Sequence, residues 1–234
     1  YFASIGEAED LAADGDALTP ATLTESSETS TVAHSGKAFE ITRWAQSGTG
    51  DPYAEGSRQI LVALKRRLDK ALIDAAKSAT GWGSYTYDRS AIGDGKITYD
   101  SLTETLALFG DETGDLAALA LHSKVYKDLL QIKDTTGRPL WVDTSGVGLP
   151  KLTALGIPII VSDRLAAVAT VYPGLLLKKG ALAAWIDDAA LEVLTDVDVL
   201  TNADIAAVHM YYVVHRYLRY DGLSKPGVAI LKTK

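Results

Sequence analysis

The sequence predicts an α+β protein, because it combines one long helix with several β-branched runs in no regular order. Residues 53–79 place apolar side chains at spacings of three and four, the pattern of an amphipathic helix. Residues 157–161 and 205–218 are rich in β-branched and aromatic side chains, which favours strands. These segments do not alternate as βαβ units do, so a doubly wound parallel sheet is not expected.

The composition is that of a globular protein. The chain has 234 residues, of which 47% are hydrophobic and 23% are charged, enough for one large domain or two small ones. No apolar run reaches the length of about 18 residues that a membrane-spanning helix needs, so no membrane partner is expected. Cysteine is absent, which excludes disulfides and thiolate metal sites.

The negative charge is concentrated at the N-terminus. The formal net charge is −7, and residues 1–28 contain no basic side chain and seven acidic ones: Glu7, Glu9, Asp10, Asp14, Asp16, Glu25 and Glu28. The remainder is balanced and has no basic stripe, unlike a sequence-reading nucleic-acid binder. Residues 1–23 have few large apolar side chains to offset their ordering entropy. They predict either a disordered tail or an arm that orders against another subunit.

Residues 24–44 predict a β-hairpin. β-branched and aromatic residues flank Ser35-Gly36, which is a turn signal. An isolated hairpin is marginal in water, so it is expected to pack on its own domain or on a neighbour. Residues 45–52, around Gly48 and Gly50, then predict a hinge.

The helix predicted over residues 53–79 has clear start and stop signals. Asp51 is a candidate N-cap, and Pro52 suits the first helical turn. Gly81 and Gly83 are expected to end the helix. The apolar face is expected to contain Leu61, Leu64, Leu68, Leu72, Ala75 and Ala79.

The rest of the chain predicts shorter elements. Helices are expected over residues 99–109 and 122–133, and residues 116–121 fit either a buried strand or the start of a helix. Strands are expected over residues 157–161, 168–177 (with a break at Pro173-Gly174), 181–185, 191–194, 205–218 and 228–231.

The order of these elements resembles the tailed-phage major capsid fold, which encapsulin shells share. Four stretches strengthen the likeness: Ile97–Leu102, His122–Tyr126, Gly156–Asp163 and Arg219–Gly227. The resemblance covers essentially the whole chain and lies in the order of the stretches. It implies an N-terminal arm at 1–23, an extended β-hairpin loop at 24–50, a peripheral domain at 51–99 and 191–234 with a spine helix at 53–79, and an axial domain at 100–190.

The resemblance also implies a function. It implies a major capsid protein, not an enzyme, whose copies form hexamers and pentamers of an icosahedral shell around phage double-stranded DNA, without sequence-specific recognition. Its location is the virion, after assembly in the host bacterial cytoplasm, with scaffolding, portal and cement or decoration proteins as partners. Two alternatives stay open: an encapsulin-type compartment, and a soluble α+β hydrolase whose site the sequence does not identify.

The resemblance further implies a candidate cross-link between subunits. Some members of this fold join a lysine of the extended loop to an asparagine of the peripheral domain with the help of an acidic residue. Lys37 lies at the predicted hairpin tip, Asn202 is the only asparagine, and Asp204 is its nearest acid. Relatives use a glutamate in place of this aspartate. The alternative is that Lys37 and Asn202 are ordinary turn residues with no part in a cross-link.

No residue pattern predicts a catalytic, cofactor-binding or metal site. Asp94-Gly95 resembles half of a calcium loop, but the loop lacks its other ligands. The Asp-Thr-Gly-like stretches at 134–137 and 143–146 each carry an extra residue that the aspartic-protease motif does not have. The four histidines, His34, His122, His209 and His215, show no metal-ligand spacing.

Overall fold

The computed structural model describes residues 29–48, 50–78, 85–110, 112–133, 151–152, 157–187, 193–198, 200–217 and 227–234, together with residues 20, 22, 25, 27 and 137. Nearly all of the predicted arm, residues 1–23, lies outside these described residues, as do Gly81 and Gly83. The described part mixes helices with two sheets, which confirms the α+β prediction.

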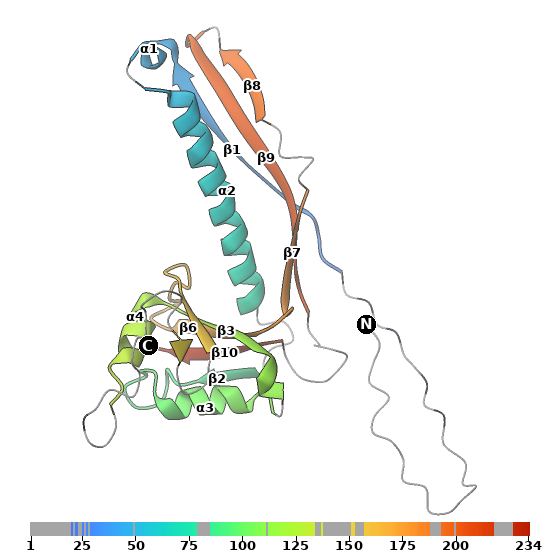
Figure 1. Ribbon diagram of the computed structural model, residues 1–234, viewed down its shortest axis with the longest axis vertical. Coiled ribbons are helices and arrows are strands. Elements are labelled where there is room, and N and C mark those ends of the chain that lie inside the picture. The colour runs from blue at the N-terminus through green and yellow to red at the C-terminus, as the bar shows by residue number, and fades with distance from the viewer. Residues whose placement is uncertain are drawn as a thin grey trace, which may run out of the picture.

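The upper part of the molecule in Figure 1 is a long sheet with one helix alongside it. The strands are β1 (Ala33–Thr42), β7 (Leu182–Ile186), β8 (Val193–Asp198) and β9 (Ala203–Arg216). β9 is central, because it pairs antiparallel with β1 on one side and with β7 and β8 on the other. The short helix α1 (Arg43–Gln46) leads from β1 to the long helix α2 (Pro52–Lys77).

The helix α2 confirms the predicted long helix. The Asp51 carboxylate accepts hydrogen bonds from two backbone N–H groups of the first turn, both at 3.1 Å, and Pro52 takes the first helical position. Its buried side chains include Ile60 and Leu64, which pack with Val208, Met210 and Tyr212 of β9. The buried stripe of the helix therefore contains Ile60. Leu61 was expected on the apolar face, but it is 53% exposed.

The hairpin turn predicted at Ser35-Gly36 is wrong. Strand β1 runs unbroken through these residues and pairs with β9 from Ala33 opposite Tyr212 to Thr42 opposite Ala203. The local turn signal is overridden because β1 finds a partner far away in the sequence. The side chain of Ile41 is buried, and that of Phe39 packs against the core between α2 and β9.

The lower part of the molecule in Figure 1 is a six-stranded mixed sheet in the order β2-β10-β6-β3-β5-β4. β2–β10 and β3–β5 are parallel pairs, and the other pairs are antiparallel. The strands are β2 (Thr86–Asp88), β3 (Leu116–Leu121), β4 (Lys151–Leu152), β5 (Ile157–Val161), β6 (Tyr172–Lys178) and β10 (Val228–Thr233).

Two helices complete the core of this lower part and confirm two predictions. α3 (Tyr99–Ala107) begins with a capping box between Thr98 and Ser101, and α4 (Ser123–Leu130) follows β3. A 3-10 turn, η2 (Glu112–Asp115), precedes β3, so residues 116–121 are a strand. The core contains side chains from both helices and four strands, among them Leu102, Phe109, Leu121, Leu129 and Leu231.

The break expected at Pro173-Gly174 is absent, because β6 continues through both residues. Pro173 is tolerated near the start of the strand. Gly174 has a packing role, since a Cβ there would lie 2.9 Å from Cδ2 of Leu121. The glycine therefore leaves room for the Leu121 side chain.

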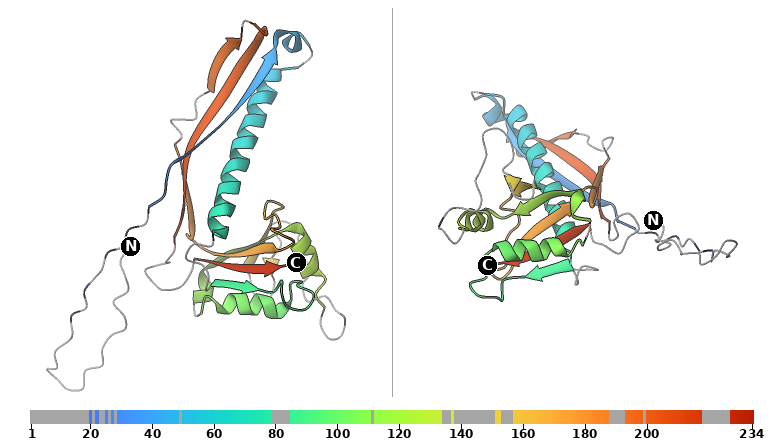
Figure 2. Two further views of the ribbon diagram at one scale, coloured as in Figure 1. Left: turned by 180° about the vertical axis from the view of Figure 1, so that it is seen from behind. Right: turned by 60° about the horizontal axis from the view of Figure 1, so that its bottom comes forward.

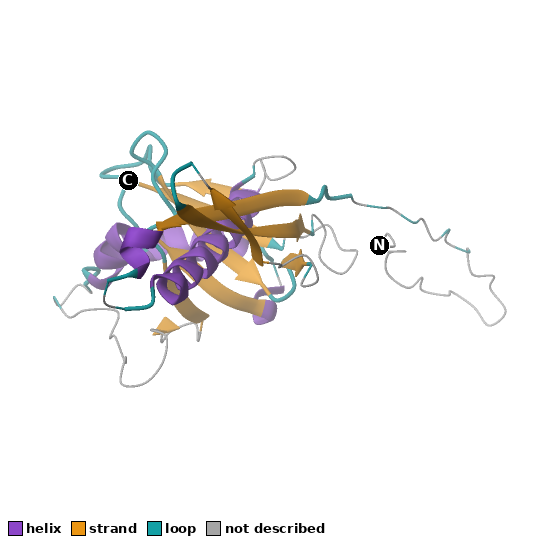
Figure 3. Ribbon diagram, turned by 90° about the horizontal axis from the view of Figure 1, so that it is seen from above, coloured by secondary structure: helices purple, strands orange, loops and turns teal. Residues whose placement is uncertain are grey.

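The two sheets divide the chain differently from the predicted domain ranges. β2 and β10 fall in the ranges predicted for the peripheral domain, 51–99 and 191–234, but they belong to the six-stranded sheet. β7 falls in the range predicted for the axial domain, 100–190, but it pairs with β9 of the long sheet. The two parts meet at the end of α2, where Ala76 packs with Leu165, Leu175 and Val228. Figures 2 and 3 show α2 beside the long sheet from behind and from above.

Candidate assembly surfaces

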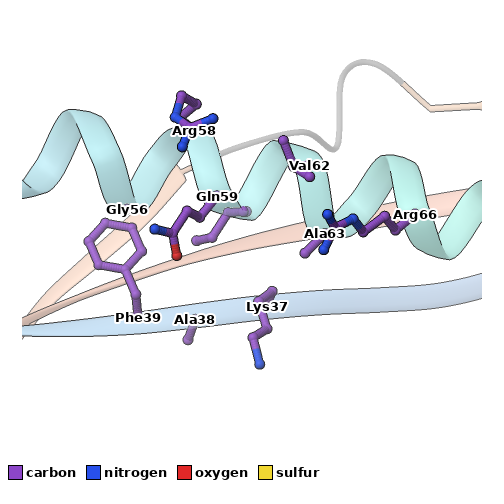
Figure 4. Close-up of a pocket in the computed structure, with 10 residues that line it drawn as sticks. Lys37, Ala38, Phe39, Gly56, Arg58, Gln59, Val62, Ala63 and Arg66 are labelled. Carbon is purple, nitrogen blue, oxygen red and sulfur yellow. The ribbon is translucent and has the colours of Figure 1, made fainter.

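A groove of about 460 Å³ lies between β1 and the first half of α2 (Figure 4). Its floor depends on Gly56, because a Cβ at this position would lie 2.6 Å from Cε2 of Phe39. A glycine inside a helix costs about 1 kcal/mol relative to alanine, and here it makes room for an aromatic ring. The groove is lined by Lys37, Ala38, Phe39, Gly56, Arg58, Gln59, Ile60, Val62, Ala63 and Arg66.

The groove has an uncompensated positive charge. Arg58 forms an ion pair with Glu55 at 2.7 Å, and hydrogen bonds from Arg58 and Gln59 lower the pKa of Glu55 to about 2. Within the described residues, neither Lys37 nor Arg66 forms an ion pair. The groove therefore favours an acidic occupant.

The same side of the molecule contains a free sheet edge. β1 is the outermost strand in the order β1-β9-β7, so its outer backbone groups have no strand partner in the part of the chain that the structure describes. Such an edge is a template for an added strand, and natural proteins cover it or pair it. The groove and the edge together can hold an extended segment.

Large apolar side chains are exposed at the tip, which we define as α1 and the turn between β8 and β9. Trp44 is 87% exposed and Leu200 is 97% exposed. The two parts of the tip are joined because the Arg43 N–H donates to the Asn202 carbonyl at 3.1 Å. Trp185 on β7 and Tyr211 on β9 are exposed by 52% and 41%. The exposed apolar side chains make the tip a candidate contact surface.

The structure does not bring the candidate cross-linking residues together in one subunit. Lys37 lies in the middle of β1 opposite Val208, and Asn202 lies in the turn before β9 with a φ of 50°. Six residues of extended chain separate Asn202 from Val208, which is about 20 Å. Only two different copies could join these side chains.

Asp204 is occupied by hydrogen bonds. Its carboxylate accepts from the Tyr53 hydroxyl at 2.5 Å and from the Gln46 amide at 2.8 Å. The Tyr53 hydrogen bond is the main cause of the lowered pKa of Asp204, and the same bond raises the pKa of Tyr53. This contact ties the start of α2 to the start of β9, so Asp204 has a structural role.

We expect Tyr53→Phe to lower the melting temperature at pH 7. The hydrogen bond from Tyr53 stabilises the folded state because it lowers the pKa of the Asp204 carboxyl group. This stabilisation is present above the unfolded-state pKa of about 4, and it is lost as the pH falls through the folded-state pKa. The difference between variant and wild type should therefore shrink in acid. Thermal unfolding at several pH values tests this, with Tyr211→Phe as the matched control; a pH-independent difference would contradict it.

The described residues contain no group of three or more histidine, aspartate or glutamate side chains placed to hold a metal ion. Among the helices that the structure describes, none is long and apolar enough to cross a membrane. Neither the groove nor the tip is predicted by the sequence. The available signals are Gly56 inside the predicted helix and Trp44 just before the predicted hinge.

Comparison with known proteins identifies a family. A family model described as phage capsid protein matches residues 24–225. No curated protein matches the chain.

Solved structures share the fold at low identity. The capsid of a native GTA particle has 16% identity and a TM-score of 0.68, over 100% of this chain and 84% of that one. Gordonia phage Cozz has 13% identity and a TM-score of 0.69, over 99% of this chain and 79% of that one. The holo-SrpI encapsulin complex from Synechococcus elongatus PCC 7942 has 17% identity and a TM-score of 0.65, over 90% of this chain and 77% of that one. Because the family match covers most of the sequence, the chain belongs to the phage capsid protein family and is a structural protein of a capsid shell.

Proposed function

We propose that this chain is a major capsid protein whose copies form the hexamers and pentamers of an icosahedral shell around phage double-stranded DNA. The family match over residues 24–225 carries this proposal. The basic groove, the free edge of β1 and the exposed tip support it, because a shell needs complementary patches on every copy. The role is structural and includes no catalytic step.

Each part of the fold has a role in such a shell. The long sheet with α2 as its spine helix is the peripheral domain, and the six-stranded sheet with α3 and α4 is the axial domain around the five-fold and six-fold centres. This division follows the strand pairing and not the sequence ranges. It places β7 in the peripheral domain, and β2 and β10 in the axial domain.

The remaining partners follow from the resemblance of the whole chain to phage coat proteins. They are scaffolding, portal and cement or decoration proteins, with assembly in the host bacterial cytoplasm. DNA is enclosed without being read, because the net charge is −7 and the sequence has no basic stripe.

An encapsulin-type compartment is the second candidate function. The similarity to the SrpI encapsulin complex, with a TM-score of 0.65, favours it at the level of the fold. The contents of shells isolated from the native source separate the two candidates. Double-stranded DNA supports the capsid, and a packaged enzyme with no nucleic acid supports the compartment.

We infer that the groove between β1 and α2 binds the acidic N-terminal segment, residues 1–28, of a second copy. Seven acidic side chains and no basic ones complement Lys37 and Arg66, which form no ion pair with any of the described residues. The free edge of β1 can add the same segment as a strand. A single acidic segment would thus contact both the groove and the edge of β1.

Deleting residues 1–23 should leave a folded body that assembles poorly. The deletion removes five of the seven acids, whereas the core packing described above involves residues from Ala33 onward. Circular dichroism and electron microscopy measure folding and shell yield. A truncated chain that folds and forms shells at the wild-type yield would refute the role of the segment.

The contact or cross-link between Lys37 and Asn202 of different copies stays a prediction. Asp204 already accepts two hydrogen bonds, so it would have to give these up to assist the reaction. A denaturing gel of assembled shells tests the covalent bond. Covalent multimers that disappear in Lys37→Ala support it, and a single band at the monomer mass excludes it.

A further inference from the structure

Two histidines that are far apart in the sequence meet on the long sheet. His34 on β1 lies opposite Tyr211 on β9, and the next pair on the same face of the sheet is Gly36 opposite His209. Nε2 of His34 is 3.0 Å from Nδ1 of His209. His34 is exposed and His209 is half-buried, so both rings can be reached from solvent.

Two neighbours position this pair. A Cβ at Gly36 would lie 2.8 Å from Nδ1 of His209, so the missing side chain provides the space in which the His209 ring crosses toward β1. The ring of Tyr211 stacks on His34 with centroids 4.4 Å apart and planes within 9°. A strand glycine weakens a sheet and often marks a close approach, which explains its presence in β1.

We propose that His34 and His209 form a binding site for a late first-row divalent metal ion, such as Cu²⁺, Ni²⁺ or Zn²⁺. Imidazole nitrogens are preferred ligands of these ions. With metal–nitrogen bonds of about 2.0–2.1 Å, two ligands lie about 2.9 Å apart at a right angle and about 3.3 Å apart at a tetrahedral angle. The observed 3.0 Å lies between these values, so little backbone movement is required.

Binding requires a rearrangement of protons and rings. In the neutral pair, one ring donates its N–H to the lone pair of the other. The metal ion takes the place of that proton, and the proton moves to the second nitrogen of the same ring. Both rings then tilt so that a lone pair of each points at the metal. Water completes the coordination sphere, because no further carboxylate or histidine joins the pair among the described residues.

The test is titration of the full-length chain with Cu²⁺, followed by calorimetry and electron paramagnetic resonance. We expect one ion per chain with two nitrogen ligands. His34→Ala and His209→Ala should each weaken binding by at least about tenfold, and Gly36→Ala should also weaken it because the new Cβ displaces the His209 ring. His122→Asn and His215→Ala are the matched controls and should bind as the wild type does.

The outcome does not depend on shell formation, because binding is measured on unassembled chains. Circular dichroism verifies that each variant is folded. Unchanged affinity in folded His34→Ala or His209→Ala would overturn the proposal, as would a resonance spectrum with a single nitrogen ligand. In that case the two rings form only a hydrogen bond.

Discussion

Replacing Leu121 with alanine is expected to lower the free energy of unfolding by about 2–5 kcal/mol. Leu121 is fully buried at the end of β3, and its side chain packs beneath Gly174 of β6. Alanine would leave a cavity among side chains from both helices and four strands, and a glycine backbone cannot fill it. Urea unfolding of the unassembled chain measures the loss.

The control for this experiment is Leu61→Ala on α2. The chemical change is the same, but Leu61 is 53% exposed, so its loss should change the free energy of unfolding by no more than about 0.5 kcal/mol. Equal effects at the two positions would contradict the packing described for the six-stranded sheet.

The double variant Lys37→Glu and Arg66→Glu should lower the yield of shells by more than about tenfold. Both side chains line the groove between β1 and α2, and neither has an ion-pair partner in the described part of the chain. Reversing their charge would repel the acidic segment that we place there. Like charges across an interface cost several kcal/mol, and about 1.4 kcal/mol already corresponds to a tenfold change in binding.

The matched control keeps the charge and exchanges the side chains, as Lys37→Arg with Arg66→Lys. This variant should assemble nearly as well as the wild type, and both variants should have wild-type circular dichroism spectra. Normal assembly of the charge-reversed protein would exclude the groove as the binding site of residues 1–28 without affecting the family assignment.

Local signals predicted most of the helices and strands. The helix α2 could be predicted because its N-cap Asp51, its first-turn Pro52 and its apolar spacing all lie within one segment. The strand β9 and the helices α3 and α4 were predictable for the same reason. Where one stretch of sequence contains both the pattern and its boundary, the prediction agrees with the structure.

The errors arise where a distant partner decides the outcome. Ser35-Gly36 has the composition of a turn, but its pairing with β9 makes it part of a strand. β7 and β10 likewise join their sheets through partners far away in sequence, which position along the chain does not reveal. The contact between His34 and His209 depends on the register of β1 against β9, which spacing along the chain does not reveal.

Electron microscopy of the purified full-length chain under assembly conditions tests the central claim most directly. We predict closed shells of uniform size, many times wider than a single subunit, with density arranged in pentamers and hexamers. A folded chain that stays a compact monomer under all conditions, even with its native scaffolding partner, would contradict the claim that this protein builds a capsid.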